Sequence, residues 1–258
     1  MTRAASLLVD IGNSRVKLGL WREGQLAATL ACTHAQMMDA AAGQFDPLTA
    51  LGTAAGRLDA AWAVSVGHAR LNEALQAWCS AQGLALHWWL KDELPAGFVN
   101  AYRAPTLGAD RLLAAIAAWA IAGRGNEALV IASFGTATTV DTVAAGRYEG
   151  GMIAPGIALM LDSLSAGTAH LPRVPAESLQ LDARAKTTPE AIAAGVAAAQ
   201  RGLIDQALQA ARSATGCEPN LYVSGGAAVG AAGILPAHTL LPHAVLQGLG
   251  VVRDSAQR

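Results

Sequence analysis

The chain has few of the residues that indicate a disulfide framework or a metal centre. Its 258 residues include three cysteines, Cys32, Cys79 and Cys217, which lie far apart and form no C-x-x-C pair. An odd number of widely spaced cysteines predicts reduced thiols. The six histidines are scattered, and neither H-E-x-x-H nor H-x-x-x-H is present, which argues against a zinc site.

Excess charge and long apolar runs are also absent. The net charge is −1, so no broad basic surface is predicted for nucleic acid or an anionic membrane. The longest apolar helical run, residues 112–122, is shorter than the ~20 residues that span a bilayer. The apolar residues 7–9 are too few for a signal peptide, and Asp10 interrupts them. We therefore expect a cytoplasmic protein that binds neither nucleic acid nor membrane.

Two familiar nucleotide-binding motifs are missing, G-x-x-x-x-G-K-[ST] and a G-x-G-x-x-G that opens a helix. The chain instead has glycine turns that lie between two apparent strands. In the first, residues 6–9 lead into Asp10, Gly12, Asn13 and Ser14, and Val16–Trp21 leads out. Hydroxyl and backbone N–H groups at such a turn can bind phosphate. The alternative is an ordinary hairpin, since Gly and Asn favour one in any case.

Two further glycine turns also follow directly after an apparent strand. The apolar residues 128–132 lead into Ser133, Gly135, Thr136 and Thr138, after which β-branched residues predict a second strand. The third turn, Gly225 and Gly226 after the strand 220–224, leaves room for a flat base or ribose, or is a plain strand–helix turn. Three such turns predict a duplicated fold that holds a nucleotide between its halves.

The rest of the chain alternates strands and helices, which predicts mixed sheets with helices on their faces. We expect a turn at 146–151, helices over 157–164, 189–214 and 246–252, an irregular stretch over 165–172, and a linker at 123–127. Thr187 or Thr188 is the predicted N-cap of the longest helix. Asp110 lies where a rigid polar segment meets a helix. It is either an N-cap or first-turn acid of that helix, or a carboxylate that faces a substrate.

Taken in order, the three turns resemble the motifs of the acetate and sugar kinase, Hsp70 and actin superfamily. More specifically, the chain resembles type III pantothenate kinase, including the relatives known as Bvg accessory factors. The resemblance covers nearly the whole chain and rests on DIGNSRVKLGL, NAYRAPTLGADR, FGTATTVD, GGMIAPGIALM, GTAHLP and VSGGAA. It implies an α/β fold of duplicated ribonuclease H-like (actin-like ATPase) domains, 1–120 and 121–258. Each would be a mixed β-sheet flanked by helices, with a nucleotide cleft between them and the last helix packed on the first half.

The resemblance also implies an activity, the ATP-dependent phosphorylation of pantothenate in the first step of coenzyme A biosynthesis. Asp10 matches the residue beside Mg²⁺ and the phosphates, and Lys17 a phosphate contact. Asp110 matches the catalytic aspartate that activates the pantothenate hydroxyl. Further implied contacts are Gly12, Asn13, Ser14, Gly135, Thr136, Thr138, Gly225 and Gly226 for ATP, and Tyr102, Gly108, Arg111 and Thr168 for pantothenate. Family members are homodimers.

One position departs from the family pattern. Ser133 stands where the family usually has an aspartate that helps to bind a monovalent cation. A hydroxyl supplies no charge, so we expect the K⁺ or NH₄⁺ requirement to be weakened or absent. Two other functions stay open: a kinase of the same superfamily for another hydroxylated substrate, and a non-catalytic accessory protein that keeps the nucleotide fold.

Overall fold

The computed structural model describes residues 5–125 and 127–257, which divide into two compact units. Unit 1 comprises the chain up to Phe98, Ala104–Ala120 and the C-terminal segment from Ala244. Unit 2 comprises Val99–Arg103 and Ile121–His243. Asn126, in the expected linker, lies outside the described residues. Among the described residues, no helix is long and apolar enough to cross a bilayer.

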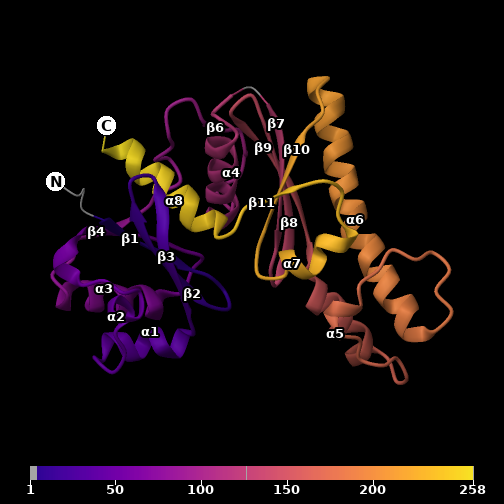
Figure 1. The fold of residues 1–258 in the computed structure, drawn as a ribbon, viewed down its shortest axis with the longest axis horizontal. Helices are drawn as coiled ribbons and strands as arrows, with labels where there is room; N and C mark the ends of the chain where they lie inside the picture. Colours follow the sequence, from indigo (N-terminus) through magenta and orange to yellow (C-terminus); the bar gives the residue numbers. More distant parts are fainter. Residues whose placement is uncertain (1–4, 126, 258) are drawn as a thin grey trace. The chain divides into compact units, whose positions relative to one another are not determined.

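Unit 1 contains a five-stranded sheet (Figure 1) in the order β3-β2-β1-β4-β5. Its strands are β1 (Ala5–Ile11), β2 (Val16–Arg22), β3 (Gln25–Cys32), β4 (Leu58–Ser65) and β5 (Leu86–Trp88). Its helices are α1 (His34–Ala41), α2 (Pro47–Ala50), η1 (Ala55–Arg57), α3 (Ala69–Ala81), α4 (Ala109–Ile121, whose last residue falls in unit 2) and α8 (Ala244–Ala256).

Unit 2 contains a six-stranded sheet in the order β11-β10-β7-β8-β9-β6. Its strands are β6 (Val99–Asn100), β7 (Ala128–Phe134), β8 (Ala137–Ala144), β9 (Arg147–Pro155), β10 (Asn220–Ser224) and β11 (Thr239–Leu240). Its helices are α5 (Ile157–Gly167), η2 (Ala176–Ser178), α6 (Thr188–Thr215), α7 (Ala228–Ala231) and η3 (Ala232–Ile234).

The two sheets share one topology. In each, three antiparallel strands form a meander, β1-β2-β3 or β7-β8-β9. The first strand of each meander also pairs in parallel with a later strand, β4 or β10, which pairs in parallel with β5 or β11. Only β6, added to β9, has no counterpart in unit 1 among the described strands. The sequence is therefore folded as a duplicated α/β unit.

Alternation along the strands explains how helices come to cover both faces of the unit 1 sheet. Residues two apart on a strand share a face. Leu7, Val9 and Ile11 pack with Leu75 and other side chains of α1 and α3. On β2, Gly19 and Trp21 instead lie against α8, where Leu246 and Gly250 approach them closely.

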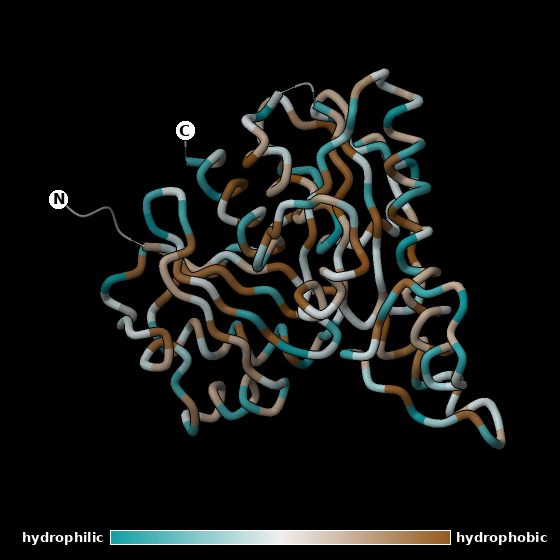
Figure 2. The backbone as a smooth tube through the Cα atoms, turned by 45° about the vertical axis from the view of Figure 1, so that its right-hand side comes forward, coloured by the Kyte–Doolittle hydropathy of each residue, from teal (hydrophilic) through white to brown (hydrophobic). Residues whose placement is uncertain are grey.

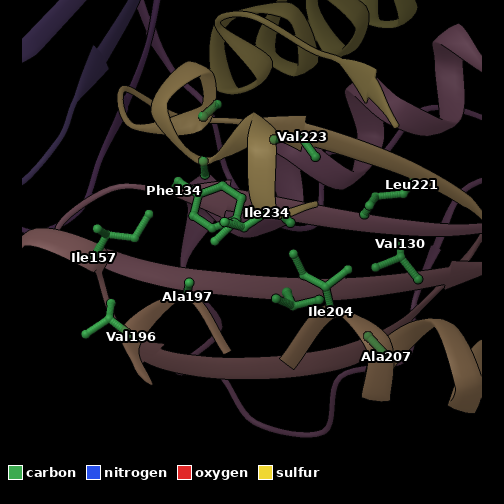
Figure 3. Close-up of a cluster of buried hydrophobic side chains, with 14 of the residues drawn as sticks. Val130, Phe134, Ile157, Val196, Ala197, Ile204, Ala207, Leu221, Val223 and Ile234 are labelled. Carbon is green, nitrogen blue, oxygen red and sulfur yellow. The ribbon is translucent and has the colours of Figure 1, made fainter. Parts of the chain in front are cut away.

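The core of unit 2 lies between its sheet and α6, the long orange helix of Figure 1. Figure 3 shows Val130 and Leu221 of the sheet facing Ile204 and Ala207 of α6. Along the tube in Figure 2, brown is concentrated on the strands and teal on the loops between elements. The small residues of α6 permit this close packing, because they bring the helix backbone near the sheet.

Local signals fix the ends of α6 where the sequence predicts them. Thr187 accepts a hydrogen bond from the N–H of Glu190, whose side chain accepts one from the N–H of Thr187, which makes a capping box. Gly216 ends the helix at φ 71°, a left-handed conformation that glycine adopts without steric cost.

Several predicted elements are wrong in their details. The expected turn at 146–151 lies mostly within strand β9, because β8 offers a complete antiparallel partner. A bulge near Glu149 and a positive φ of 113° at Gly150 accommodate the glycines within that strand. Helix α5 runs to Gly167 instead of 164, and α8 spans 244–256 instead of 246–252. Short elements such as α2, β6 and β11 carry too little periodicity to be predicted.

Candidate functional site

In unit 1, Asp10 and Lys17 lie opposite each other on β1 and β2. Directly opposed residues on neighbouring strands project from the same face, so the two side chains meet. The Lys17 Nζ lies 3.8 Å from the Asp10 Oδ2, an ion pair too long for a hydrogen bond. The Asp10 side chain is 6% exposed and that of Lys17 is 40% exposed. The carboxylate is therefore buried beneath an ammonium group that reaches solvent.

Burial raises the pKa of Asp10 from its usual 3.8 to about 6. Loss of hydration is the largest cause, and the nearby Asp110 carboxylate raises the pKa further. The positive charge of Lys17 opposes both effects. A buried carboxylate with one partly exposed cation beside it is poorly neutralised, so an added cation would stabilise its charged form.

The turn after β1 is held at its base and exposed at its tip. The N–H of Gly12 donates to the carbonyl of Arg15 at 3.1 Å, which closes the turn. Asn13 and Ser14 are exposed at the tip. The Nε2 of His34 lies 3.0 Å from the Gly12 carbonyl oxygen and fixes the turn from outside the motif. Sequence reasoning missed His34, because a lone histidine gives no spacing signal.

Asp110 lies in the first turn of α4, so the prediction of a first-turn acid is confirmed and that of an N-cap is not. Its Oδ1 accepts a hydrogen bond from the N–H of Arg111 at 2.9 Å. A Cβ on Gly108 would lie 2.5 Å from the same oxygen, so the carboxylate is packed over the Gly108 backbone. The Asp110 carboxylate is close enough to Asp10, in the same unit, to contribute to the raised pKa of Asp10. Arg111, which follows Asp110 in the sequence, is 7% exposed.

In unit 2, the equivalent turn joins β7 and β8 and is neutral. Ser133 pairs with Thr139 on β8 and with Ser224 on β10, so hydroxyl residues stand side by side on three strands. Gly135 and Thr136 are exposed at the tip. Two backbone hydrogen bonds shape the turn, from Gly135 N–H to Ala137 and from Gly156 N–H to Thr136.

Thr138 is the exception within this turn. Its side chain is fully buried, and its hydroxyl is one of the few buried polar groups of the described residues without a hydrogen-bond partner. Phosphate binding through the Thr138 hydroxyl would require it to become accessible. The exposed groups at the tip are those of Gly135 and Thr136, and these are better placed to meet a ligand.

The third turn packs directly on the second. Gly225 has a φ of 99°, and a Cβ there would lie 2.1 Å from the carbonyl oxygen of Phe134. The same oxygen accepts a hydrogen bond from the N–H of Ala227. Gly225 is therefore required by close approach of two backbones. Gly226 has open space around its Cα and is exposed, so it can lie against a ligand.

Tyr102 belongs to unit 2, where it is held by β9. The N–H of Ala101 donates to the carbonyl of Tyr148, and the Tyr102 ring lies over Gly150 at 3.5 Å from the position of a Cβ. The Tyr148 hydroxyl donates to the buried Asp141 at 2.7 Å. Sequence reasoning assigned Tyr148 and Asp141 no role. The sequence analysis included Gly150 and Gly151 in a turn, so it gave no signal of this close packing.

Thr168, the remaining predicted contact, is the C-cap residue of α5. Its hydroxyl donates to the Leu164 carbonyl at 2.7 Å and accepts from the N–H of Leu171 at 3.3 Å. The side chain is exposed. In this conformation the Thr168 hydroxyl is hydrogen-bonded within its own segment.

The described residues include no group of three or more His, Cys, Asp or Glu that could hold a metal ion. Asp10, with Asp110 near it, would therefore offer a divalent cation no more than two protein carboxylates. This suits Mg²⁺ that arrives with a nucleotide, because Mg²⁺ keeps several waters and uses phosphate oxygens together with one or two carboxylates. The burial and raised pKa of Asp10 fit that role.

The matching family model is that of type III pantothenate kinase, over residues 6–210. A type III pantothenate kinase of Bordetella pertussis is 37% identical over 268 aligned residues, which cover 95% of this chain and 96% of the relative. That of Burkholderia vietnamiensis is 37% identical over 262 residues, with 96% of each chain covered.

Two solved structures share the fold. A Baf family protein from Campylobacter jejuni superposes with a TM-score of 0.65 at 21% identity, covering 98% of this chain and all of the other. Component A of the (R)-2-hydroxyglutaryl-CoA dehydratase of Acidaminococcus fermentans gives 0.55 at 12% identity, with 98% of both chains covered. Together with the two sheets, these similarities confirm the predicted fold class.

Proposed function

Because the chain belongs to the type III pantothenate kinase family, we propose that it transfers the γ-phosphoryl group of ATP to the primary hydroxyl of pantothenate. The product is 4′-phosphopantothenate, and the reaction is the first step of coenzyme A biosynthesis. The observation that carries the proposal is the ion pair of Asp10 and Lys17 in unit 1, with Asp110 close enough to raise the pKa of Asp10. Phosphoryl transfer requires positioning and charge neutralisation more than covalent chemistry.

Asp110 has the role of the base. It orients the pantothenate hydroxyl and takes its proton as the hydroxyl oxygen bonds to the γ-phosphorus and the bond to the bridging oxygen of ADP breaks. Its position in the first turn of α4 supports this role, because packing over Gly108 and the bond from the Arg111 N–H hold the carboxylate in one orientation. Gly108 and Arg111 are the neighbouring pantothenate contacts.

Asp10 and Lys17 act on the phosphates. A divalent cation brought with ATP neutralises phosphate oxygens, and Asp10 would hold it directly or through water. Lys17 adds a positive charge at the exposed end of the ion pair. Asn13 and Ser14 at the exposed tip, with Gly12 at the base of the same turn, add polar and backbone groups for the same phosphates.

Unit 2 contributes groups for ATP and pantothenate that carry no charge. We assign Gly135, Thr136 and Thr138 to the phosphates, although the burial of Thr138 makes its contribution the least direct. Gly225 and Gly226 are assigned to the adenosine, with Gly225 shaping the turn. Tyr102 and Thr168 are assigned to pantothenate.

Four expectations remain predictions. They are the domain boundary at 120, the homodimer, the cytoplasmic location and a K⁺ or NH₄⁺ requirement that is weak or absent. The row of hydroxyl residues around Ser133 supports the last of these, because it supplies no negative charge. Size-exclusion chromatography with light scattering would test the dimer.

The direct test is ADP release by the purified protein with Mg-ATP and a panel of acceptors, including pantothenate, glucose and N-acetylglucosamine. We expect ADP release with pantothenate and with none of the other acceptors. Mass spectrometry should identify the product as 4′-phosphopantothenate. Turnover with a sugar instead would favour another kinase of the superfamily. Nucleotide binding without phosphorylation of any acceptor would overturn the proposal in favour of an accessory protein.

A further inference from the structure

The chain has only three lysines, and one of them holds two backbone carbonyls of a single loop. The Lys91 Nζ donates to the carbonyl oxygens of Pro105 at 2.6 Å and Leu107 at 2.9 Å. An ammonium group has three N–H donors, so two of them are committed to this loop. Charge-assisted hydrogen bonds of this length are among the stronger kinds in proteins.

The loop that Lys91 holds has little other regular support. Residues 101–108 belong to no helix or strand. The chain leaves unit 1 after Phe98 and re-enters it at Ala104, so Lys91 binds the loop immediately after re-entry. The side chain of Leu107 is buried in the same place, which ties the end of the loop to unit 1.

Lys91 is itself well anchored. The N–H of Trp89 donates to the carbonyl of Ala63 on β4, and its indole Nε1 donates to the carbonyl of Glu93 at 2.9 Å. The Glu93 side chain accepts a hydrogen bond from the N–H of Leu90. The Trp89 side chain is buried, at 5% exposed. The turn that carries Lys91 therefore has a fixed position relative to the sheet.

The held loop ends at the residues that orient Asp110. Leu107 directly precedes Gly108, whose carbonyl accepts the bond from the Leu112 N–H at 3.3 Å. The Asp110 carboxylate packs over Gly108, with its Oδ1 2.5 Å from the position of a Cβ. A displacement of the Leu107 carbonyl would therefore move Gly108 and, with it, the surface on which the carboxylate rests.

We propose that Lys91 is a positioning residue for phosphoryl transfer, which fixes the Asp110 carboxylate by holding the Pro105 and Leu107 carbonyls. The inference rests on the proposed function, in which Asp110 receives the hydroxyl proton. Lys91 influences the reaction only by holding this loop in place. It differs from Lys17, whose ammonium lies beside Asp10.

The test compares Lys91→Met, Lys91→Arg and the control Lys186→Met, which removes an exposed lysine in unit 2. We expect Lys91→Met to lower kcat about tenfold with the KM for Mg-ATP unchanged, since a misplacement of about 1 Å can cost roughly 10²-fold. Lys91→Arg should recover most of the loss, because a guanidinium also donates to two acceptors. Lys186→Met should behave as the unmodified protein.

A second arm separates positioning from general damage. Lys91→Met is introduced beside Asp110→Asn, and kcat is compared for the two single variants and the double variant. If Lys91 acts through Asp110, it should cost nothing further in the double variant. A full additional tenfold loss there, or unchanged turnover in Lys91→Met alone, would overturn the inference. Full turnover in Asp110→Asn would instead overturn the role of Asp110 in the proposed function.

Discussion

At the end of the first meander strand, unit 1 has Asp10 and unit 2 has Ser133, each two residues before the glycine of its turn. The neighbours differ in the same way. Asp10 stands between Lys17 and Val64, whereas Ser133 stands between Thr139 and Ser224. One topology thus carries a buried carboxylate paired with a partly exposed lysine in one copy and a row of hydroxyl residues in the other.

The difference indicates where the chemistry is concentrated. Burying a carboxylate is unfavourable, and the raised pKa of Asp10 measures that cost. A hydroxyl at the same point imposes no such cost. Strongly perturbed groups cluster at functional sites, so the comparison favours charge neutralisation in unit 1 and neutral contacts to ATP in unit 2.

The largest expected effect comes from removing the charge in unit 1. Asp10→Asn should lower kcat by about 10²-fold or more, the usual scale for losing a preorganised electrostatic group. The same variant should be more stable than the unmodified protein at pH 7, by on the order of 2 to 3 kcal/mol, because a buried ionised group is removed. Urea unfolding in the presence of a chelator measures the second effect.

The pH dependence of stability provides a control for the predicted stabilisation by Asp10→Asn. The pKa of folded Asp10 is raised to about 6 from 3.8, so the folded state binds the proton more tightly than the unfolded state. This tighter proton binding by Asp10 adds to the free energy of unfolding. The added stability is fully present below pH 4 and is lost as the pH rises through 6. The difference between Asp10→Asn and the unmodified protein should grow over that window. A constant difference, or the same growth for the exposed Asp39→Asn, would contradict the account.

In unit 2, the backbone is expected to matter more than charge. Gly225→Ala should reduce the free energy of unfolding by about 2 to 3 kcal/mol, because φ is 99° and the added Cβ meets the Phe134 carbonyl. Gly226→Ala is the matched control, since its Cβ would enter open space. Thermal unfolding of both variants makes the comparison. Equal losses would show that the close approach is not what requires Gly225.

A smaller effect is expected beneath Tyr102. Tyr148→Phe removes the donor to buried Asp141 and should cost about 1 to 3 kcal/mol of stability. Because the Tyr102 ring lies within the same packing, with ring centroids 6.2 Å from Tyr148, we also expect a higher KM for pantothenate with the KM for Mg-ATP unchanged. Equal changes in both KM values would argue that Tyr148 supports unit 2 in general.

The smallest effect should come from giving unit 2 the carboxylate that unit 1 has at the equivalent position. Turnover of the unmodified protein should be indifferent to K⁺, because Ser133 and its neighbours are neutral. Ser133→Asp should introduce stimulation by K⁺ of about fivefold, which corresponds to roughly 1 kcal/mol. The assay titrates KCl against choline chloride in both proteins. Strong K⁺ dependence before the substitution would mean that other residues build the cation site.

Much of the fold could be predicted, because its signals are local. The short apolar runs of β1 and β7, the β-branched residues that follow in β8, and the capping box of α6 are all encoded in neighbouring residues. Strand β9 was mistaken for a turn, since Gly150 and Gly151 look like breakers until β8 is known to pair with them.

The site residues were predicted mainly from the order of the motifs. The contacts that hold these residues in place could not be predicted. The sequence placed Asp110 at a helix start, but burial of Asp10 and its closeness to Asp110 depend on tertiary structure. His34 contacts Gly12, which is 22 residues away in the sequence, and Lys91 contacts Leu107, which is 16 residues away. Neither contact belongs to a sequence motif. Such long-range polar contacts leave no periodic trace in a single sequence.

The central claim is that charged side chains of unit 1 carry out the transfer, whereas neutral groups of unit 2 contact ATP. It is tested most directly by measuring single-turnover phosphoryl transfer in Asp110→Asn together with the affinity of this variant for Mg-ATP. The account predicts a transfer rate lower by about 10²-fold or more, the scale for losing a positioned base, with Mg-ATP affinity unchanged. A parallel loss of affinity and rate, or a transfer rate that does not fall, would contradict it.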